Sequence, residues 1–280
     1  MTNAMPRTGG AAPGAVAGDL RITLVQRETV WHDPEANRAG IAADLAAHAT
    51  PTDLIVLPET FTTGFSNEAV ATAEAPDGPT RAWMHALARQ HGAAVVGSLP
   101  VREADGVRNR LLFARPDGTD DRYDKRHLFR MAREHERYVA GRDALTVAWR
   151  GWRIRPLVCY DLRFPVFARN RAHPDGTLAY DLLLFVANWP APRHEAWRTL
   201  LRARAIENLA FVAGVNRTGT DGNGHPYDGG SVLADPLGEV VHECGPSAAI
   251  VTVTAARARL EAHRARFPAH LDADGFTLDA

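Results

Sequence analysis

Several runs of apolar residues in this sequence are short and continuous, with no polar residue at alternate positions. Examples are DLIVLPE (53–59), YDLLLFVANW (180–189) and AFVAGVN (210–216). A strand that is apolar on both faces has to be covered on both sides, which is typical of sheets packed beneath helices. The sequence therefore predicts a layered α/β fold.

The remaining segments extend this pattern along the chain. Strands and helices alternate, and the helices are marked by 3.6-residue spacing and by start and stop residues such as Pro and Gly. Further strands are predicted over 20–26, 93–100, 110–116 and 152–160, closing strands within 231–254, and helices over 34–49, 78–92 and 193–209. The stretch DGNGHPYDGG (221–230) predicts turns and not a phosphate-binding loop.

The first residues differ in composition from the rest. Residues 1–19 are rich in Gly, Ala and Pro, and no repeat or linker divides the chain after them. We therefore expect a disordered tail over 1–19 and a single domain over 20–280. The tail has neither a signal-peptide pattern nor a run long enough to anchor the chain in a membrane, so the expected location is the cytoplasm.

Charge and metal-ligand patterns narrow the function classes. The chain has 32 basic and 33 acidic residues, and a net charge of −1 argues against a nucleic-acid partner. Its two cysteines and twelve histidines form no metal-ligand or disulfide spacing, so neither a metal nor an organic cofactor is expected.

One of the two cysteines lies at a predicted strand end. Cys159 closes the run PLVC and is followed by YDLRFP, in which Pro165 can open a helix. A nucleophile at such a strand-to-helix turn is exposed and has backbone N–H groups nearby. The alternative is a buried cysteine that only packs, and we prefer that interpretation for Cys244.

Two further groups with useful chemistry lie at predicted strand ends. Lys125, the only lysine of the chain, follows the strand-like DDRYD, and Glu59 ends the run DLIVLPE. A lysine ammonium is more compact than a guanidinium, and a partly desolvated carboxylate can serve as a base. If the two converge with Cys159, we expect a nucleophilic thiol, its base and an oxyanion stabiliser. A surface glutamate and an incidental lysine are the alternatives.

These three motifs in this order resemble the nitrilase superfamily of carbon–nitrogen hydrolases, whose signature is a Glu-Lys-Cys triad. The triad motifs here are LPETFTTGF, YDKRHLF and LVCYDLRFP. The blocks VANWPAPR (186–193), RAIEN (204–208) and GVNRTGTDGNGHPYDGGS (214–231) resemble the branch called ω-amidases. The resemblance extends over residues 20–280.

The resemblance implies a four-layer α-β-β-α sandwich that pairs into homodimers or higher homo-oligomers. It also implies a second glutamate between the lysine and cysteine motifs, which we assign to Glu134, with Glu136 as the alternative. One residue departs from the family pattern. We expect an acidic residue before Ser231, whereas this chain has Gly230.

The implied substrates are short amides with a carboxylate at the other end, such as 2-oxoglutaramate or succinamate. Such a substrate needs a cationic partner. The implied reaction also uses the backbone N–H of Tyr160 beside the oxyanion. The candidate substrate-binding residues are Tyr160, Arg163, Trp189, Phe65, Arg130 and Arg193.

Other activities remain open at this stage. A nitrilase, an N-carbamoyl hydrolase or an aliphatic amidase would use the same triad, and a non-catalytic binding protein can inherit the fold. An α/β-hydrolase is disfavoured because the sequence has no GxSxG motif.

Overall fold

The computed structural model describes residues 18–278 of the 280-residue chain. Most of the expected N-terminal tail, residues 1–17, lies outside the described residues. The last two residues of that segment already contact the fold. The Gly18 carbonyl accepts a hydrogen bond from Trp152 Nε1 at 2.8 Å, and the Asp19 carboxylate accepts one from the backbone N–H of Arg257 at 2.9 Å.

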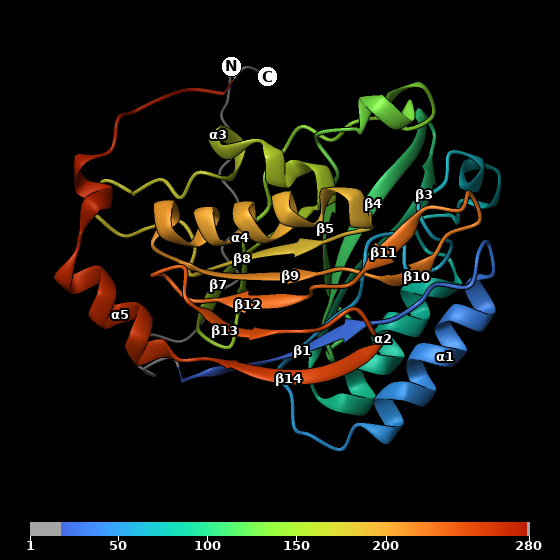
Figure 1. Cartoon of the computed structure of the whole chain (residues 1–280), viewed down its shortest axis with the longest axis horizontal. Helices are drawn as coiled ribbons and strands as arrows, with labels where there is room; N and C mark the ends of the chain where they lie inside the picture. Colours follow the sequence, from blue (N-terminus) through green and yellow to red (C-terminus); the bar gives the residue numbers. More distant parts are fainter. Residues whose placement is uncertain (1–17, 279–280) are drawn as a thin grey trace.

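The described chain forms two six-stranded mixed sheets (Figure 1). In spatial order, the first sheet contains β14 (Ala249–Ala255), β1 (Leu20–Gln26), β2 (Leu54–Val56), β3 (Ala94–Glu103), β4 (Gly106–Ala114) and β5 (Asp120–Asp124). The second contains β13 (Val240–Glu243), β12 (Val232–Ala234), β9 (Phe211–Val215), β8 (Leu182–Val186), β7 (Trp152–Val158) and β6 (Val147–Trp149). Each sheet has three parallel strands, β1-β2-β3 and β7-β8-β9, flanked by antiparallel ones.

Successive side chains of a strand point to opposite faces of the sheet, so the first sheet contacts a different apolar core on each face. In β2, Leu54 and Val56 belong to the core between the sheets, whereas Ile55 belongs to the core beneath the helices α1 (Pro34–Ala47) and α2 (Pro79–His91). The helix α4 (His194–Asn208) covers the outer face of the second sheet (Figure 1). The order helix, sheet, sheet, helix confirms the predicted four-layer α-β-β-α sandwich.

The predicted strands and helices are present, several with shorter bounds. The apolar run 53–59 contains a strand of only three residues, because the chain leaves the sheet after Val56 in a loop that carries Glu59. Two features were missed: β6, and the hairpin of β10 (Thr218–Thr220) and β11 (Pro226–Asp228), part of which we predicted as turns. Strands of three residues are too short to show an alternating pattern.

The remaining helical segments are short or terminal. They are α3 (Pro165–Ala168), α5 (Arg257–Arg266) and the 3₁₀ helices η1 (Glu68–Thr72), η2 (Arg130–Ala132), η3 (Glu134–Glu136), η4 (Cys159–Arg163), η5 (Ala191–Arg193) and η6 (Ala269–Asp272). No helix within residues 18–278 has the length and apolar character needed to cross a membrane.

Parallel strands from both sheets direct their carboxyl ends to a common region. Glu59 follows β2, Cys159 directly follows β7, and Asn188 follows β8. Side chains at the carboxyl ends of parallel strands commonly build the functional site of an α/β protein. The fold therefore brings together residues that are about a hundred positions apart in the sequence.

Candidate active site

An ion-paired cluster lies in this region. Lys125 Nζ is 2.9 Å from Glu59 Oε1, and 3.1 and 3.0 Å from the two carboxylate oxygens of Glu134. The three side chains are essentially inaccessible to solvent. The structure thus removes the alternative of a solvated Glu59, and the only lysine of the chain has a buried environment with two carboxylates.

Of the two candidate second glutamates, the structure brings Glu134 to the lysine. Glu134 is buried at the start of η3 and also accepts a hydrogen bond from the backbone N–H of Phe129 at 2.5 Å. Glu136, two residues later, is exposed and forms an ion pair with Arg133 at 2.7 Å. The sequence alone does not distinguish Glu134 from Glu136, because both lie in the same polar stretch. The orientation of the 3₁₀ turn η3 relative to Lys125 decides which of them is buried.

Cys159 occupies a constrained turn between β7 and η4. Its backbone φ is +45°, in the left-handed region that residues other than glycine adopt infrequently. Such a conformation persists only where the surrounding structure stabilises it, and it is frequent at functional sites. The Cys159 Sγ donates a hydrogen bond to the Asn188 carbonyl oxygen at 3.8 Å.

The buried Asp161 carboxylate fixes this turn to the segment that carries the lysine. It accepts hydrogen bonds from Val158 N at 3.0 Å, from Tyr123 OH at 2.7 Å and from His127 N at 3.0 Å. Tyr123 and His127 lie two residues before and after Lys125. Asp161 therefore links the turn at Cys159 to both sides of Lys125.

The electrostatics favour a neutral thiol beside a charged lysine. Burial raises the pKa of Cys159 well above its ordinary value, and the negative charge of Glu59 adds to this rise. Burial alone would lower the pKa of Lys125, but the carboxylates of Glu134 and Glu59 outweigh it and hold that pKa well above its ordinary value. Burial also raises the pKa of Glu134, against the opposing charge of Lys125.

Two asparagines that the sequence analysis missed contact Glu59. The backbone N–H of Asn188 donates to Glu59 Oε2 at 2.8 Å, and the Asn188 side-chain amide donates to the Glu59 carbonyl at 2.6 Å. Asn109, on β4, donates from Nδ2 to Glu59 Oε1 at 2.9 Å. Asn188 lies in the block VANWPAPR, but its role depends on a contact with a residue 129 positions away.

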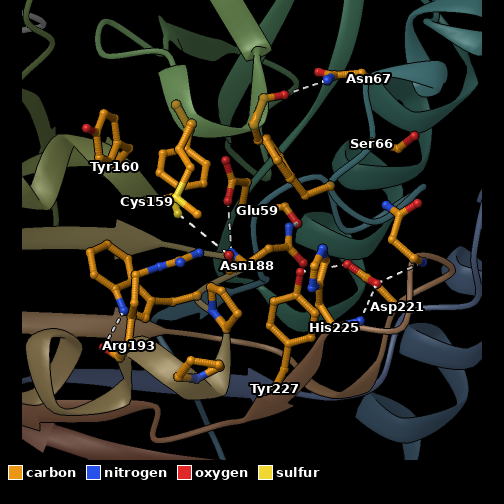
Figure 2. A pocket seen from close by; sticks show the side chains of 18 of the residues that line it. Glu59, Ser66, Asn67, Cys159, Tyr160, Asn188, Arg193, Asp221, His225 and Tyr227 are labelled. Carbon is orange, nitrogen blue, oxygen red and sulfur yellow. Dashed lines mark hydrogen bonds between the residues drawn. The ribbon is translucent and has the colours of Figure 1, made fainter.

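A cavity of about 300 Å³ opens at Cys159. This is at the small end of the range for small-molecule sites. Figure 2 shows Tyr160 and Arg193 on one side of Cys159, and Asp221 and His225 on the other. The lining residues include five of the six predicted substrate-binding residues: Phe65, Tyr160, Arg163, Trp189 and Arg193.

Arg130, the sixth predicted substrate-binding residue, is outside the cavity lining. It is exposed at the start of η2, whereas its neighbours Phe129 and Met131 both line the cavity. Successive side chains of a tight turn point in different directions, so a position within the motif does not ensure access to the site. The structure therefore does not bring Arg130 together with the other five candidates.

The two arginines that line the cavity are not paired with acids. Arg163 lies 5.0 Å from the Trp189 ring centroid, and Arg193 lies 5.2 Å from that of Phe129. Within residues 18–278, neither guanidinium forms a salt bridge. Aromatic faces thus support both cations while leaving their N–H groups for another partner.

The hairpin β10–β11, which the sequence did not predict, forms one wall of the cavity. Asp221 is buried and accepts hydrogen bonds from the backbone N–H groups of Asn223 and His225, both at 2.9 Å, and from Tyr227 OH at 2.9 Å. These four residues line the cavity. The sequence indicated only turns here, and the carboxylate of Asp221 is used to hold the hairpin in shape.

Gly230, the departure from the expected pattern, has a local explanation. Its φ is +72°, and a Cβ built on it would lie 2.5 Å from Cε1 of His194. The Gly230 carbonyl accepts a hydrogen bond from Trp197 Nε1 at 2.8 Å. A side chain at this position would be strained by the positive φ, and its Cβ would displace the imidazole of His194. Gly230 is not among the residues that line the cavity.

Other candidate groups do not form a second centre. Cys244 is a buried free thiol away from the cavity lining, with Sγ 3.8 Å from His242 Nε2. Across the described part of the chain, no cluster of three or more His, Cys, Asp or Glu residues is arranged to hold a metal ion.

The fold and this site define an enzyme of the carbon–nitrogen hydrolase class. Residues 21–265 match the family model described as carbon–nitrogen hydrolase, and the chain belongs to this family. The match confirms the resemblance to the nitrilase superfamily, and the protein is an amidohydrolase.

Known proteins give a closer comparison. Omega-amidase YafV of Escherichia coli K12 is 49% identical over 260 residues, covering 92% of this chain and 98% of that protein. The 2-oxoglutaramate amidase of Bacillus subtilis is 33% identical, covering 82% and 88%. Among solved structures, XC1258 of Xanthomonas campestris, a CN-hydrolase superfamily protein with an arsenic adduct in its active site, has a TM-score of 0.92. It is 57% identical, with 93% and 99% of the two chains covered.

Proposed function

We propose that this protein hydrolyses the terminal amide of short ω-amido dicarboxylates, such as 2-oxoglutaramate or succinamate, to the acid and ammonia. The observation that carries the proposal is one cavity that joins Cys159, Glu59 and Lys125 to two arginines without a salt-bridge partner among residues 18–278. The names of the relatives, omega-amidase and 2-oxoglutaramate amidase, support this substrate class.

In the first step, Glu59 accepts the thiol proton as Cys159 Sγ attacks the amide carbonyl carbon. Because burial raises the pKa of Cys159, we start the reaction from the protonated thiol and transfer its proton during the attack. The carbonyl oxygen becomes an oxyanion, which the Lys125 ammonium and the backbone N–H of Tyr160 stabilise. Glu134 orients Lys125 through the two contacts described above.

In the second step, the tetrahedral intermediate collapses to a thioester. Glu59 returns its proton to the nitrogen, the C–N bond breaks and ammonia leaves. A water molecule then attacks the thioester carbon while Glu59 accepts one of its protons. The C–S bond breaks, Glu59 returns that proton to the sulfur, the acid is released and the thiol of Cys159 is restored.

The distal carboxylate of the substrate requires a cationic partner, and we assign it to Arg193 and Arg163. Both guanidiniums line the cavity beside aromatic rings and lack an acidic partner among residues 18–278. Arginine binds a carboxylate through two parallel N–H donors, which also fixes the orientation of the substrate. The aromatic residues Phe65 and Trp189 enclose the short chain between the two ends.

The test is ammonia release from 2-oxoglutaramate and succinamate by the purified protein and by Cys159→Ala. We expect turnover by the native protein and none by the variant, because the thioester cannot form without the thiol. A panel of nitriles, N-carbamoyl amino acids and aliphatic amides is measured in parallel. If a panel compound is hydrolysed while both ω-amides are not, the thiol chemistry stands and the substrate class is wrong.

The arginine assignment predicts a rise in KM. Arg193→Leu and Arg163→Leu should each raise KM for succinamate about 10-fold or more, because each removes a charge-assisted contact of about 1.5–3 kcal/mol. Arg130→Leu is the matched control, since Arg130 is exposed outside the cavity, and it should leave KM unchanged. If Arg130→Leu has the same effect as the other two, a specific contact with the cavity arginines is contradicted.

We also propose that the protein acts as a cytoplasmic homodimer or higher homo-oligomer, as the family resemblance implies. Light scattering on the purified chain measures the mass of the assembly. A monomeric mass of about 30.5 kDa at working concentration would contradict self-association.

A further inference from the structure

Asn109 is a buried polar residue with direct contacts to both glutamates of the site. It lies on β4 and is 1% exposed. Its Nδ2 donates to Glu59 Oε1 at 2.9 Å and lies 3.5 Å from Glu134 Oε1. Its backbone carbonyl accepts a hydrogen bond from the N–H of Lys125 at 2.9 Å. Asn109 therefore contacts three charged residues of the site without being charged itself.

The position of Asn109 in the strand is one that packing alone would give to an apolar residue. Leu111 and Phe113, the next residues on the same face of β4, belong to the core between the two sheets. Asn109 Oδ1 is buried and has no hydrogen-bond partner among the described residues. Leaving a buried acceptor unpaired destabilises a fold. A role at the site therefore explains an asparagine at this position better than a contribution to stability does.

That role follows from the contacts of the Asn109 amide with the carboxylates of Glu59 and Glu134. The orientation of the Asn109 amide follows from its neighbours, because only the –NH2 group can donate to two carboxylate oxygens. Glu59 Oε1 has two donors, Lys125 Nζ and Asn109 Nδ2. When Lys125 moves an N–H toward an oxyanion, the Asn109 donor remains on the carboxylate.

The Lys125 ammonium is held by both glutamates in the resting site. Nζ contacts Glu59 Oε1 and both oxygens of the Glu134 carboxylate, and one N–H is shared by that pair because the two oxygens of a carboxylate lie close together. An oxyanion beside Cys159 therefore competes with the two carboxylates for the ammonium. The neutral donor of Asn109 lowers the cost of weakening the contact between Lys125 and Glu59, because it stays with Glu59 and lies near Glu134 Oε1.

We propose that Asn109 is a positioning residue of the hydrolytic reaction: its amide group holds the Glu59 carboxylate oriented as the proton acceptor and allows the Lys125 ammonium to move toward the oxyanion. The proposal rests on the proposed function for the reaction, but it also makes a prediction for the thiol alone. The titratable groups around Glu59 are Lys125, Glu134 and Cys159, and the charges of this cluster also act on the pKa of Tyr138.

The test compares Asn109→Leu with the native protein. Leucine is close to asparagine in size and removes both the donor and the unpaired acceptor, while Glu59 Oε1 keeps Lys125 and Oε2 keeps Asn188 N. We expect the melting temperature to stay the same or rise. kcat/KM per titrated thiol should fall about 10- to 100-fold, and the acid limb of its pH profile should move up by about one pH unit. A carboxylate that has lost a donor binds a proton at higher pH, which gives the sign.

Asn170→Leu is the matched control. Asn170 is also a buried asparagine, and its side chain bonds to Tyr180 and Asn208 away from the cavity. This variant should lower the melting temperature and leave kcat/KM per titrated thiol and the acid limb unchanged. If Asn109→Leu does not fold, Asn109→Ala is measured in the same way, with active sites counted by stoichiometric alkylation.

The pH dependence of Cys159 alkylation by iodoacetamide separates this proposal from the substrate assignment. If the native protein hydrolyses no ω-amide but the alkylation profile of Asn109→Leu is displaced to higher pH, the substrate class fails and the role of Asn109 stands. If both profiles of Asn109→Leu coincide with those of the native protein, Asn109 is only a packing residue and the proposal is overturned.

Discussion

At the residue scale, the structure explains why this arginine-rich chain has its single lysine at position 125. Lys125 is buried, and its ammonium contacts three carboxylate oxygens of Glu59 and Glu134. A guanidinium is planar and larger, and its donors lie in one plane, so it fits this compact arrangement poorly. The carboxylates hold the pKa of Lys125 well above its ordinary value, which keeps the ammonium charged throughout the neutral range.

The Lys125→Arg variant tests this argument. We expect kcat to fall about 100-fold or more, as on removal of an oxyanion donor, while the protein remains folded. The measurement is ammonia release from a substrate that the native protein hydrolyses, normalised to the titrated thiol, with circular dichroism as the control for folding. Near-native turnover by the arginine variant would contradict the role of Lys125.

At the element scale, the two ends of the parallel strands differ: one end leads to the candidate site, and the other carries buried carboxylates. The carboxyl ends of β2 and β7 lead to Glu59 and Cys159, whereas the residues just before β2 and β8 are the buried Asp53 and Asp181. Asp181 pairs with Arg153 at 2.8 Å and with Arg264 of α5 at 2.7 Å. Burial alone would raise the pKa of Asp181, but its arginine partners hold it below the ordinary value.

The Asp181→Asn variant should therefore destabilise the protein in a pH-dependent way. Because the folded pKa is lowered, the contribution of Asp181 is present above its unfolded pKa and disappears as the pH falls through the folded value. We expect the free energy of unfolding to decrease by about 2–3 kcal/mol at pH 7, less than for a fully buried pair because Arg153 is partly exposed. Denaturant titrations at several pH values measure the difference between variant and native protein, which should shrink below about pH 4.

Glu136→Gln serves as the control for that experiment. Its ion pair with Arg133 is at the surface, and the pair should contribute little to stability at any pH. A loss as large as that of Asp181→Asn would show that charge removal in general, and not the buried cluster, lowers the stability.

At the scale of the whole molecule, the active site exists only when the two sheets are packed together. Glu59 and Lys125 follow strands of the first sheet, and Cys159 and Asn188 follow strands of the second. The core between the sheets is continuous and includes Leu24 and Trp152, both fully buried. Packing of this core sets the distances at the site, so stability and activity depend on the same interface.

This organisation predicts a single cooperative unfolding transition, in line with one domain over residues 20–280. Far-ultraviolet circular dichroism, tryptophan fluorescence and the loss of ammonia release should share one midpoint in denaturant, because neither sheet can expose the common core alone. Two separated transitions, or activity lost well before the secondary structure, would contradict a single folding unit.

Local sequence patterns were sufficient for the layered α/β fold, for most strands and helices, and for Glu59, Lys125 and Cys159 as candidates. Apolar runs, helical spacing and strand-end positions are properties of neighbouring residues, so they can be recognised before folding. Lys125 and Cys159 were also distinguished by their chemistry, one as the only lysine and the other by its turn.

Only the tertiary structure decided which of several similar residues reach the site. It brought Glu134 and not Glu136 to Lys125, left Arg130 outside the cavity, and placed Asn109 against two carboxylates, one of them 50 positions away. It also closed one wall with the hairpin β10–β11, whose strands are too short to give a pattern. These outcomes depend on distances between segments far apart in the chain and on the direction in which each turn points its side chains. The packing of the two sheets determines both.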